Sequence, residues 1–210
     1  MLDPLTISSI LRTIAFPALI SMGMVQLMIA GEIDLSTAAV MSFCAVLSAK
    51  LIKDFNFEVP EAVIIVLLCS LLIGCVNAFL TVKIGIFSVI ATIGTGFVVR
   101  GLSYSFTNGV PIYPMPESFA FLGSLRPLNI SFTFFLMLAV AFFVQLLLTS
   151  TKWGTAIYAT GSNRQAAEVS GINTFRVKLI CFMATSFLSG CAGLLTMSQL
   201  PGTPGDPIIG

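Results

Sequence analysis

Five long apolar stretches constrain this chain more than any other feature of its sequence. They cover residues 10–30, 62–82, 84–106, 128–148 and 179–200. A helix needs about 20 mainly apolar residues to cross the hydrocarbon core of a bilayer. The stretches do not alternate apolar and polar residues with period two, as the strands of a membrane barrel do. We therefore predict an all-α, polytopic transmembrane helix bundle.

A sixth apolar segment, residues 38–52, is too short to be assigned in the same way. It contains about fifteen residues, fewer than the usual length of a spanning helix. It could form a short span, a buried half-helix or a re-entrant piece. The bundle is therefore expected to contain five to six membrane segments.

The composition supports a lipid-facing surface and excludes several functions. Charged residues make up only 9% of the 210 residues, and the net charge of +1 argues against a nucleic-acid partner. The chain has no histidine, the commonest catalytic base and metal ligand. Its five cysteines lie in apolar stretches with no metal or redox spacing, so we expect them to fill space in the core. We expect no catalytic residue, cofactor or metal site.

Small residues recur at four-residue spacing in two of the apolar stretches. This spacing lets helix backbones approach closely in lipid. The small residues are Ser70, Gly74 and Ala78 in one stretch, and the pairs Ser186 with Gly190 and Ser189 with Gly193 in another. The stretch 84–106 is thin and polar around Thr92 and Thr95, and we expect it in the middle of the bundle. Packing alone explains these residues; the alternative is a substrate path lined by Thr92, Thr95 and Arg100.

Loop charges predict the orientation of the bundle. The loop 151–177 carries Lys152, Arg164 and Arg176 against Glu168, whereas the loop 107–127 carries only Glu117 and Arg126. Because cytoplasmic loops are enriched in Lys and Arg, we expect 151–177 in the cytoplasm and 107–127 outside. Counting helices back places Lys83 inside and the turn 53–60 outside. Arg12 then lies near the outer face, which predicts a further helix before residue 10.

Two carboxylates lie in the turn between the first apolar stretch and the short one. A charge forced to the centre of a membrane helix costs about 2.5 to 3.5 kcal/mol, so Glu32 and Asp34 must lie at an interface, in a polar cavity or hydrogen-bonded to backbone. Asp34 precedes Leu35 and Ser36 in the pattern of an N-cap that opens the short helix. The alternative is a role on the translocation path near a broken helix.

The loop 151–177 contains the signature of a short, capped helix. Ser162 followed by Gln165 fits a capping box, and Gly171 fits a C-cap. Seven or eight residues do not hold a helix alone in water. The helix must therefore dock on something, either on its own protein or on a separate cytosolic partner.

Three stretches resemble the permease subunits of bacterial ABC importers for monosaccharides, the family of the ribose, xylose, galactose and autoinducer-2 permeases. The stretches are 31–36 (Gly-Glu-Ile-Asp-Leu-Ser), 90–109 (with Ala-Thr-Ile-Gly-Thr, Arg-Gly and Thr-Asn-Gly) and 152–178 (with Lys-Trp-Gly, Tyr-Ala-Thr-Gly-Ser-Asn and Ser-Gly-Ile-Asn). Glu32 departs from the glycine common in the family, and Thr37-Ala38-Ala39 departs from Ser-Val-Gly. The resemblance implies one permease domain over residues 1–210, truncated at both ends, with further helices beyond Gly210.

The resemblance also implies partners and site residues. A cytosolic ABC ATPase would hydrolyse ATP, since the chain has no phosphate-loop motif. A second permease, identical or related, and an extracytoplasmic sugar-binding protein would complete an importer in the inner membrane. The helix 163–170 would dock on the ATPase. The coupling residues would be Ser162, Asn163, Arg164, Ala166, Ala167, Glu168 and Gly171; the path candidates are Asp34, Ser36, Thr92, Thr95, Arg100 and Asn108.

Two other classes of function remain open from the residues themselves. A self-sufficient channel or secondary transporter for a small neutral solute is the first, although coupled carriers usually place an ionisable residue deep in a helix. Apart from Arg12 at the start of the first stretch, Arg100 is the only Asp, Glu, Lys or Arg within the five long stretches. A membrane-embedded enzyme is the second, but the scattered carboxylates form no catalytic set.

Overall fold

The computed structural model describes residues 4–110, 112, 119, 123, 125, 127 and 130–199, and the side chains from residue 10 onward. Within that part the chain is helical. The helices are α1 (Pro4–Ile29), α2 (Thr37–Lys53), α3 (Val59–Ala78) with the π-helical extension η1 (Phe79–Lys83), α4 (Ser88–Thr107), α6 (Phe132–Ser150), α7 (Lys152–Ser162), α8 (Arg164–Val169) and α9 (Thr174–Ser198). Five of these helical segments are long and apolar enough to cross a membrane.

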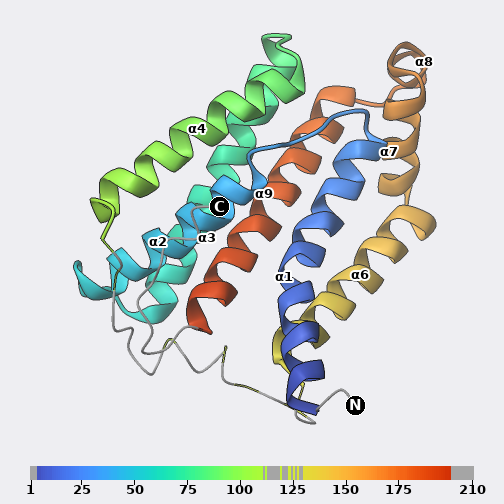
Figure 1. Cartoon of the computed structure of the whole chain (residues 1–210). Helices are drawn as coiled ribbons and strands as arrows, with labels where there is room; N and C mark the ends of the chain where they lie inside the picture. Colours follow the sequence, from blue (N-terminus) through green and yellow to red (C-terminus); the bar gives the residue numbers. More distant parts are fainter. Residues whose placement is uncertain are drawn as a thin grey trace.

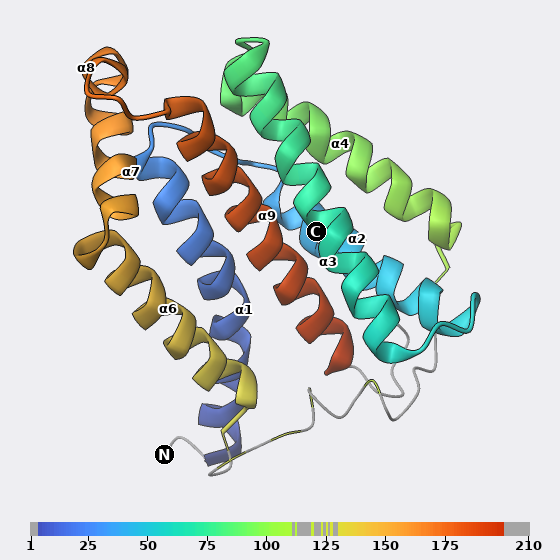
Figure 2. The ribbon, with the colours of Figure 1, turned by 180° about the vertical axis from the view of Figure 1, so that it is seen from behind.

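The helices form one bundle with two distinct ends (Figure 1). The α3–α4 turn, α7, α8 and the start of α9 lie together at the upper end. The α2–α3 turn, the ends of α4 and α9 and the start of α6 lie at the lower end, where α1 also begins (Figures 1 and 2). This grouping of the connections is the one predicted from the loop charges, with Lys83 at the end that carries α7 and α8.

The short apolar segment is a half-helix that begins inside the bundle. After α1 reaches the upper end, residues 30–36 return toward the middle, and α2 descends from there (Figure 1). Gly31 allows the reversal through its left-handed backbone, with φ of 85°. Most of α2 is buried, from Ala39 to Ile52. Of the three possibilities for this segment, the buried half-helix is the one found.

Helix α9 is the central element of the bundle. Half of its apolar stretch is buried, against 22–28% for the other four spans. It packs against α1, α2 and α3, and small residues make this possible. A Cβ added at Gly74 of α3 would lie 2.8 Å from the Met183 backbone of α9, and one at Gly190 would lie 2.7 Å from Ser70 Oγ. The prediction of close helix packing through small residues is confirmed, and the structure shows that the two helices carrying them, α3 and α9, pack on each other.

Helix α4 lies at the edge of the described bundle, so the prediction of a central position is wrong for this part of the chain. It contacts α2 along one face, where Thr92 and Gly96 are buried. Its other face exposes Ile90, Ile93 and Phe97. A Cβ added at Gly94 would meet nothing within 4 Å. The small residues of α4 therefore serve one face only.

The predicted helix boundaries hold to within a few residues, with two informative differences. Residues 84–87 form a turn through Gly85, whose φ is 88°, so α4 begins at Ser88 and not at residue 84. Helix α9 begins at Thr174, five residues before the predicted start. The Asn173 side chain caps it by accepting a hydrogen bond from Arg176 N. The cap, not the onset of apolar residues, sets this end.

Candidate functional site

A buried polar cluster surrounds Asp34 between α2 and α3. One carboxylate oxygen of Asp34 accepts hydrogen bonds from Ser36 N at 2.8 Å and from Ser36 Oγ at 2.6 Å. The Asn77 amide of α3 donates to Ser36 Oγ at 2.9 Å and to the second Asp34 oxygen at 3.3 Å. All three side chains are fully buried. Burial penalises an ionised carboxylate, and these donors offset part of that penalty.

Asp34 is not the N-cap of α2, so that prediction is wrong. The N-cap residue is Ser36, whose own side chain makes no capping bond. Asp34 instead accepts from the backbone of Ser36, two residues further on, before the helix begins. The carboxylate thus organises the turn that leads into α2.

Two hydroxyl groups of α4 bind the backbone of segment 30–36 from the other side. Ile33 N donates to Ser88 Oγ at 3.4 Å, and Leu35 N donates to Thr92 Oγ1 at 3.0 Å. Thr92 in turn donates to the backbone oxygen of Ser88 at 2.8 Å. Hydrogen bonds of this kind are required because backbone groups at membrane depth have no water to bind.

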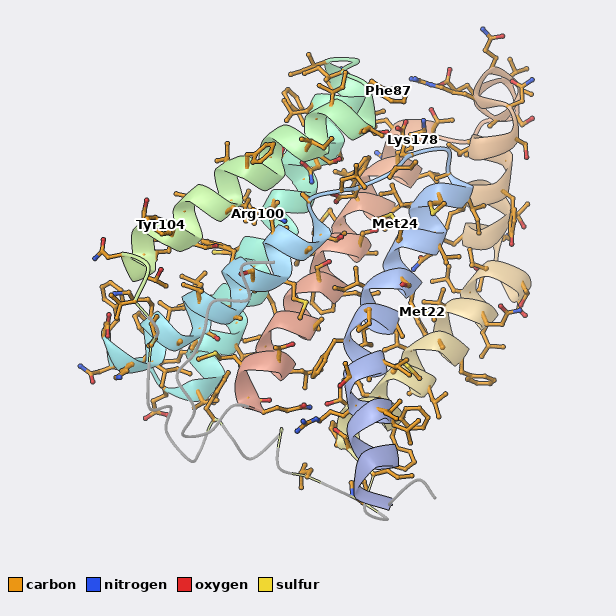
Figure 3. The ribbon with its side chains drawn as sticks, viewed as in Figure 1. Met22, Met24, Phe87, Arg100, Tyr104 and Lys178 are labelled. Carbon is orange, nitrogen blue, oxygen red and sulfur yellow. The ribbon has the colours of Figure 1, made fainter. Side chains whose placement is uncertain are left out.

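An ion pair fastens the same segment to α9. Lys178 Nζ donates to Glu32 Oε1 at 2.5 Å, and the two side chains are only 10% and 14% exposed. Lys178 lies near the upper end of the bundle, the end that also holds Phe87 (Figure 3). Segment 30–36 is therefore attached to α3, α4 and α9 by polar contacts.

The structure brings together half of the predicted path residues. Asp34, Ser36 and Thr92 meet around segment 30–36, as described above. The other three lie elsewhere on α4: Thr95 donates to its own helix at Ala91 O, and Arg100 and Asn108 are exposed. Arg100 lies well along α4 from Phe87, away from the upper end (Figure 3).

The second candidate site is an arm at the upper end, formed by α7 and α8. Its short helix is capped by Asn163, whose side chain accepts from Ala166 N at 3.0 Å. The predicted cap, Ser162, is instead the last residue of α7. Gly171, with φ of 84°, ends the arm as expected. Its N–H binds Glu168 O and Ile172 N binds Ala167 O, the paired bonds of a Schellman motif.

Side-chain contacts fix the arm to the start of α9. Glu168 Oε1 accepts from Thr174 Oγ1 at 2.6 Å and from Arg164 Nε at 2.9 Å. The hydrogen bond from Thr174, followed by that from Arg164, holds the pKa of the exposed Glu168 below its ordinary value. The carboxylate is thus charged at neutral pH and bridges α8 to α9.

The faces of α8 differ sharply in burial. Ala167 is only 3% exposed and packs inside the protein, whereas Val169 is 91% exposed. Ala166 is also exposed. The short helix therefore docks on its own protein through Ala167 and presents Ala166 and Val169 outward. The expectation that Ala166 and Ala167 face the same partner is wrong for Ala167.

The described residues contain no candidate site for metal or thiol chemistry. No group of three or more His, Cys, Asp or Glu side chains there could hold a metal ion. The cysteines Cys44, Cys69, Cys75, Cys181 and Cys191 are free, and Cys44 and Cys181 are buried. The prediction of cysteines as core filler is confirmed for these two, whereas Cys69, Cys75 and Cys191 are half-buried.

Sequence reasoning missed Asn77, Ser88 and the partnership of Glu32 with Lys178. Asn77 did carry a signal, because a lone amide within an apolar helix must find a hydrogen-bond partner. Lys178 directly follows the charged loop 151–177 in the sequence, so it resembles one more loop charge. Its partner lies 146 residues away in the sequence, a separation that no local pattern reveals.

The described helices define the class of the protein as a multi-helix membrane protein. Residues 6–205 match the family described as "Branched-chain amino acid transport system / permease component". The chain is 30% identical to the autoinducer 2 import system permease protein LsrC of Escherichia coli (strain K12 / DH10B), over 89% of this chain and 54% of that protein.

Two ribose import permeases are also similar. The chain is 32% identical to RbsC of Haemophilus influenzae, over 92% of this chain and 61% of that protein. It is 32% identical to RbsC of Bacillus subtilis, over 95% of this chain and 62% of that protein. No solved structure matches the chain. The chain thus spans 54–62% of the length of these three relatives.

The chain belongs to this family of transport-system permease components. The match confirms the resemblance to bacterial importer permeases inferred from the three sequence stretches. It is a multi-pass membrane protein, and its family is one of the bacterial inner membrane.

Proposed function

We propose that this chain is the membrane-spanning permease subunit of an ATP-driven ABC importer that moves a monosaccharide or similar small polyol. Residues 1–210 would act as one permease domain. A cytosolic ABC ATPase, a second permease subunit and an extracytoplasmic sugar-binding protein would complete the assembly. The relatives named for ribose and autoinducer 2 import support this solute class.

The observation that carries the proposal is the outward-facing apolar side chain of Val169 on a rigidly held arm. A side chain of that size gains about 1.5–3 kcal/mol when it is buried, yet Val169 is 91% exposed. Asn163, the Schellman bonds and the Glu168 contacts fix the arm in place. A preformed helix with one exposed apolar anchor suits insertion into a groove of the ATPase.

The remaining groups of the arm suit a mechanical role in which no proton is taken up or released. The described part of the arm contains no titratable cluster, and its carboxylate Glu168 is already bonded to Thr174 and Arg164. Of the coupling residues predicted from sequence, Asn163, Arg164, Ala167, Glu168 and Gly171 would shape the arm, together with Ser162 at the end of α7. Ala166 would meet the ATPase, and so would Val169, which was not among the predicted residues.

The test is to replace Val169 by Asp in the complete permease and to measure co-purification of its ATPase. A charge at the centre of an apolar contact should weaken association by about tenfold or more, the factor that 1.4 kcal/mol represents. Val110→Asp is the matched control. Val110 is also exposed, but it lies three residues after α4 ends at the lower end of the bundle, whereas the arm lies at the upper end. Equal ATPase binding by Val169→Asp and Val110→Asp would reject the docking role.

One observation favours the alternative of a self-sufficient carrier. Asp34 is a buried carboxylate beside a half-helix, an arrangement used by ion-coupled carriers. Such a carrier would take up its solute without any ATPase and would respond to a proton or sodium gradient. Uptake by the purified permease alone in proteoliposomes distinguishes the two functions.

A further inference from the structure

The buried ion pair between Glu32 and Lys178 joins two parts of the molecule that serve different purposes. Glu32 belongs to segment 30–36, which leads into the half-helix α2 inside the bundle. Lys178 lies in the second turn of α9, the helix that continues directly from the arm. By contrast, the ion pairs Lys50–Asp54 and Arg164–Glu168 each join residues four apart in the sequence and are more exposed.

A continuous series of contacts connects the arm to Lys178. Ala167 O accepts from Ile172 N at the end of α8, and Glu168 Oε1 accepts from Thr174 Oγ1 in the first turn of α9. Lys178 follows one helical turn later, at i+4 from Thr174, so it lies on the same face of α9. A displacement of α8 therefore acts on the helix end that carries Lys178.

A second series of contacts connects Glu32 to the buried cluster. Segment 30–36 has no regular structure of its own, and the backbone groups of Ile33 and Leu35 are held by α4 hydroxyls. Two residues after Glu32, Asp34 binds Ser36 at the start of α2 and Asn77 on α3. A pull on Glu32 therefore acts on the junction where the half-helix begins.

The burial of the pair makes separation of its two charges costly. At 10% and 14% exposure, neither charge can be left without a partner at low cost, since breaking a buried pair strands a charge. An exposed pair is screened by water and exerts little force over distance. The Glu32–Lys178 contact can thus transmit a movement that a surface pair would not.

We propose that Glu32 and Lys178 are positioning residues that transmit movement of the α7–α8 arm to segment 30–36 and the start of α2. The inference rests on the proposed function, because the arm moves only if an ATPase drives it. With the pair intact, closure of the ATPase rearranges the interior of the bundle. With the pair broken, the arm still docks, but its movement is not passed on.

The experiment uses the complete transporter, with its ATPase and binding protein, in proteoliposomes. Solute uptake and ATP hydrolysis are measured together for Glu32→Gln, for Lys178→Gln and for the charge-swapped double variant E32K/K178E. Lys50→Gln is the matched control, since it breaks a more exposed ion pair with Asp54, at the end of α2 opposite to segment 30–36. Co-purification of the ATPase is recorded for every variant.

Each single variant is expected to lower uptake per ATP hydrolysed by about tenfold, within the usual range of coupling between two sites, while ATPase binding is retained. The charge swap is expected to restore most of the uptake, and Lys50→Gln is expected to behave as wild type. Wild-type uptake in both single variants would overturn the proposal, and so would a swap no better than the singles. Loss of ATPase binding in the single variants would also overturn it, by placing the pair in docking.

Failure of the proposed function has a different signature. A wild-type transporter without ATP-dependent uptake would reject the importer itself, and this inference with it, before any variant is compared. A functional wild type with unaffected single variants rejects the transmission role alone.

Discussion

The amide of Asn77 on α3 donates a 2.9 Å hydrogen bond to the hydroxyl of Ser36 at the start of α2, although 41 residues separate them. Both side chains are fully buried, and both also bind Asp34. The polar groups of a helix that begins inside an apolar bundle need such partners, because no water is present to form hydrogen bonds with them. This contact fixes where α2 begins.

Replacing Asn77 by Ala should destabilise the protein, because it removes a hydrogen-bond donor from both the Asp34 carboxylate and Ser36. Leaving buried polar groups without a partner costs about 1–3 kcal/mol. Thermal unfolding in detergent measures the effect. Gln145→Ala, on the exposed face of α6, is the control and should change stability by less than about 0.5 kcal/mol. Equal melting temperatures for the two variants would mean that the cluster does not hold α2.

The same substitution at two glycines should have opposite effects on stability. Gly74→Ala would place a Cβ 2.8 Å from the α9 backbone, so the helices must separate, at a cost of about 1–3 kcal/mol. Gly94→Ala meets nothing within 4 Å and should stabilise α4 by up to about 1 kcal/mol through helix propensity. The free energy of unfolding, measured for both variants, tests these opposite expectations. A tolerated Gly74→Ala would contradict the close α3–α9 contact.

Arg substitutions at two adjacent positions of α8 should both impair the docking arm, but for different reasons. Ala166→Arg adds a charge to the exposed face, so we expect a folded arm that no longer binds the ATPase. Ala167→Arg forces a charge into a buried position and should detach the arm itself. Limited proteolysis between residues 151 and 173 separates the two effects. Similar protease resistance in both variants would contradict the burial of Ala167.

The attachment of the arm should depend on acidity. The pKa of Glu168 is lowered in the folded arm, chiefly by the Thr174 hydrogen bond. The carboxylate therefore contributes stability above its unfolded pKa, and this contribution is lost as the pH falls through the lower, folded pKa. Hydrogen exchange of residues 164–172, corrected for its intrinsic pH dependence, should increase in that acidic range. Thr174→Val should move the increase to higher pH, and an unshifted profile would count against the contact.

The sequence was sufficient to predict the elements that depend on local patterns. Apolar runs located the spanning helices, because each must present about 20 apolar residues to lipid. The four-residue spacing of Ser70 and Gly74 predicted close helix packing, since such packing requires only one small face on a helix. It did not predict that α9 is the partner. Loop charges, counted along the spans, predicted which connections share an end of the bundle, and the structure has that grouping (Figures 1 and 2).

Contacts between distant residues could not be predicted in this way. Nothing local pairs Glu32 with Lys178, or Asn77 with Asp34. The N-cap of α8 was placed one residue early because Ser162 and Asn163 are both capping residues, and only the backbone decides between them. Helix α4 was placed at the centre because its small residues were assumed to face neighbours all round, whereas Gly94 faces none.

The most direct test of the proposed importer is to measure solute uptake by the complete transporter in proteoliposomes, with ATP enclosed on the side that the arm faces. We predict monosaccharide or polyol uptake that requires ATP, the ATPase and the binding protein. Val169→Asp should abolish this uptake, and Val110→Asp should not. Uptake that continues in the permease alone, without ATP, would contradict the proposal.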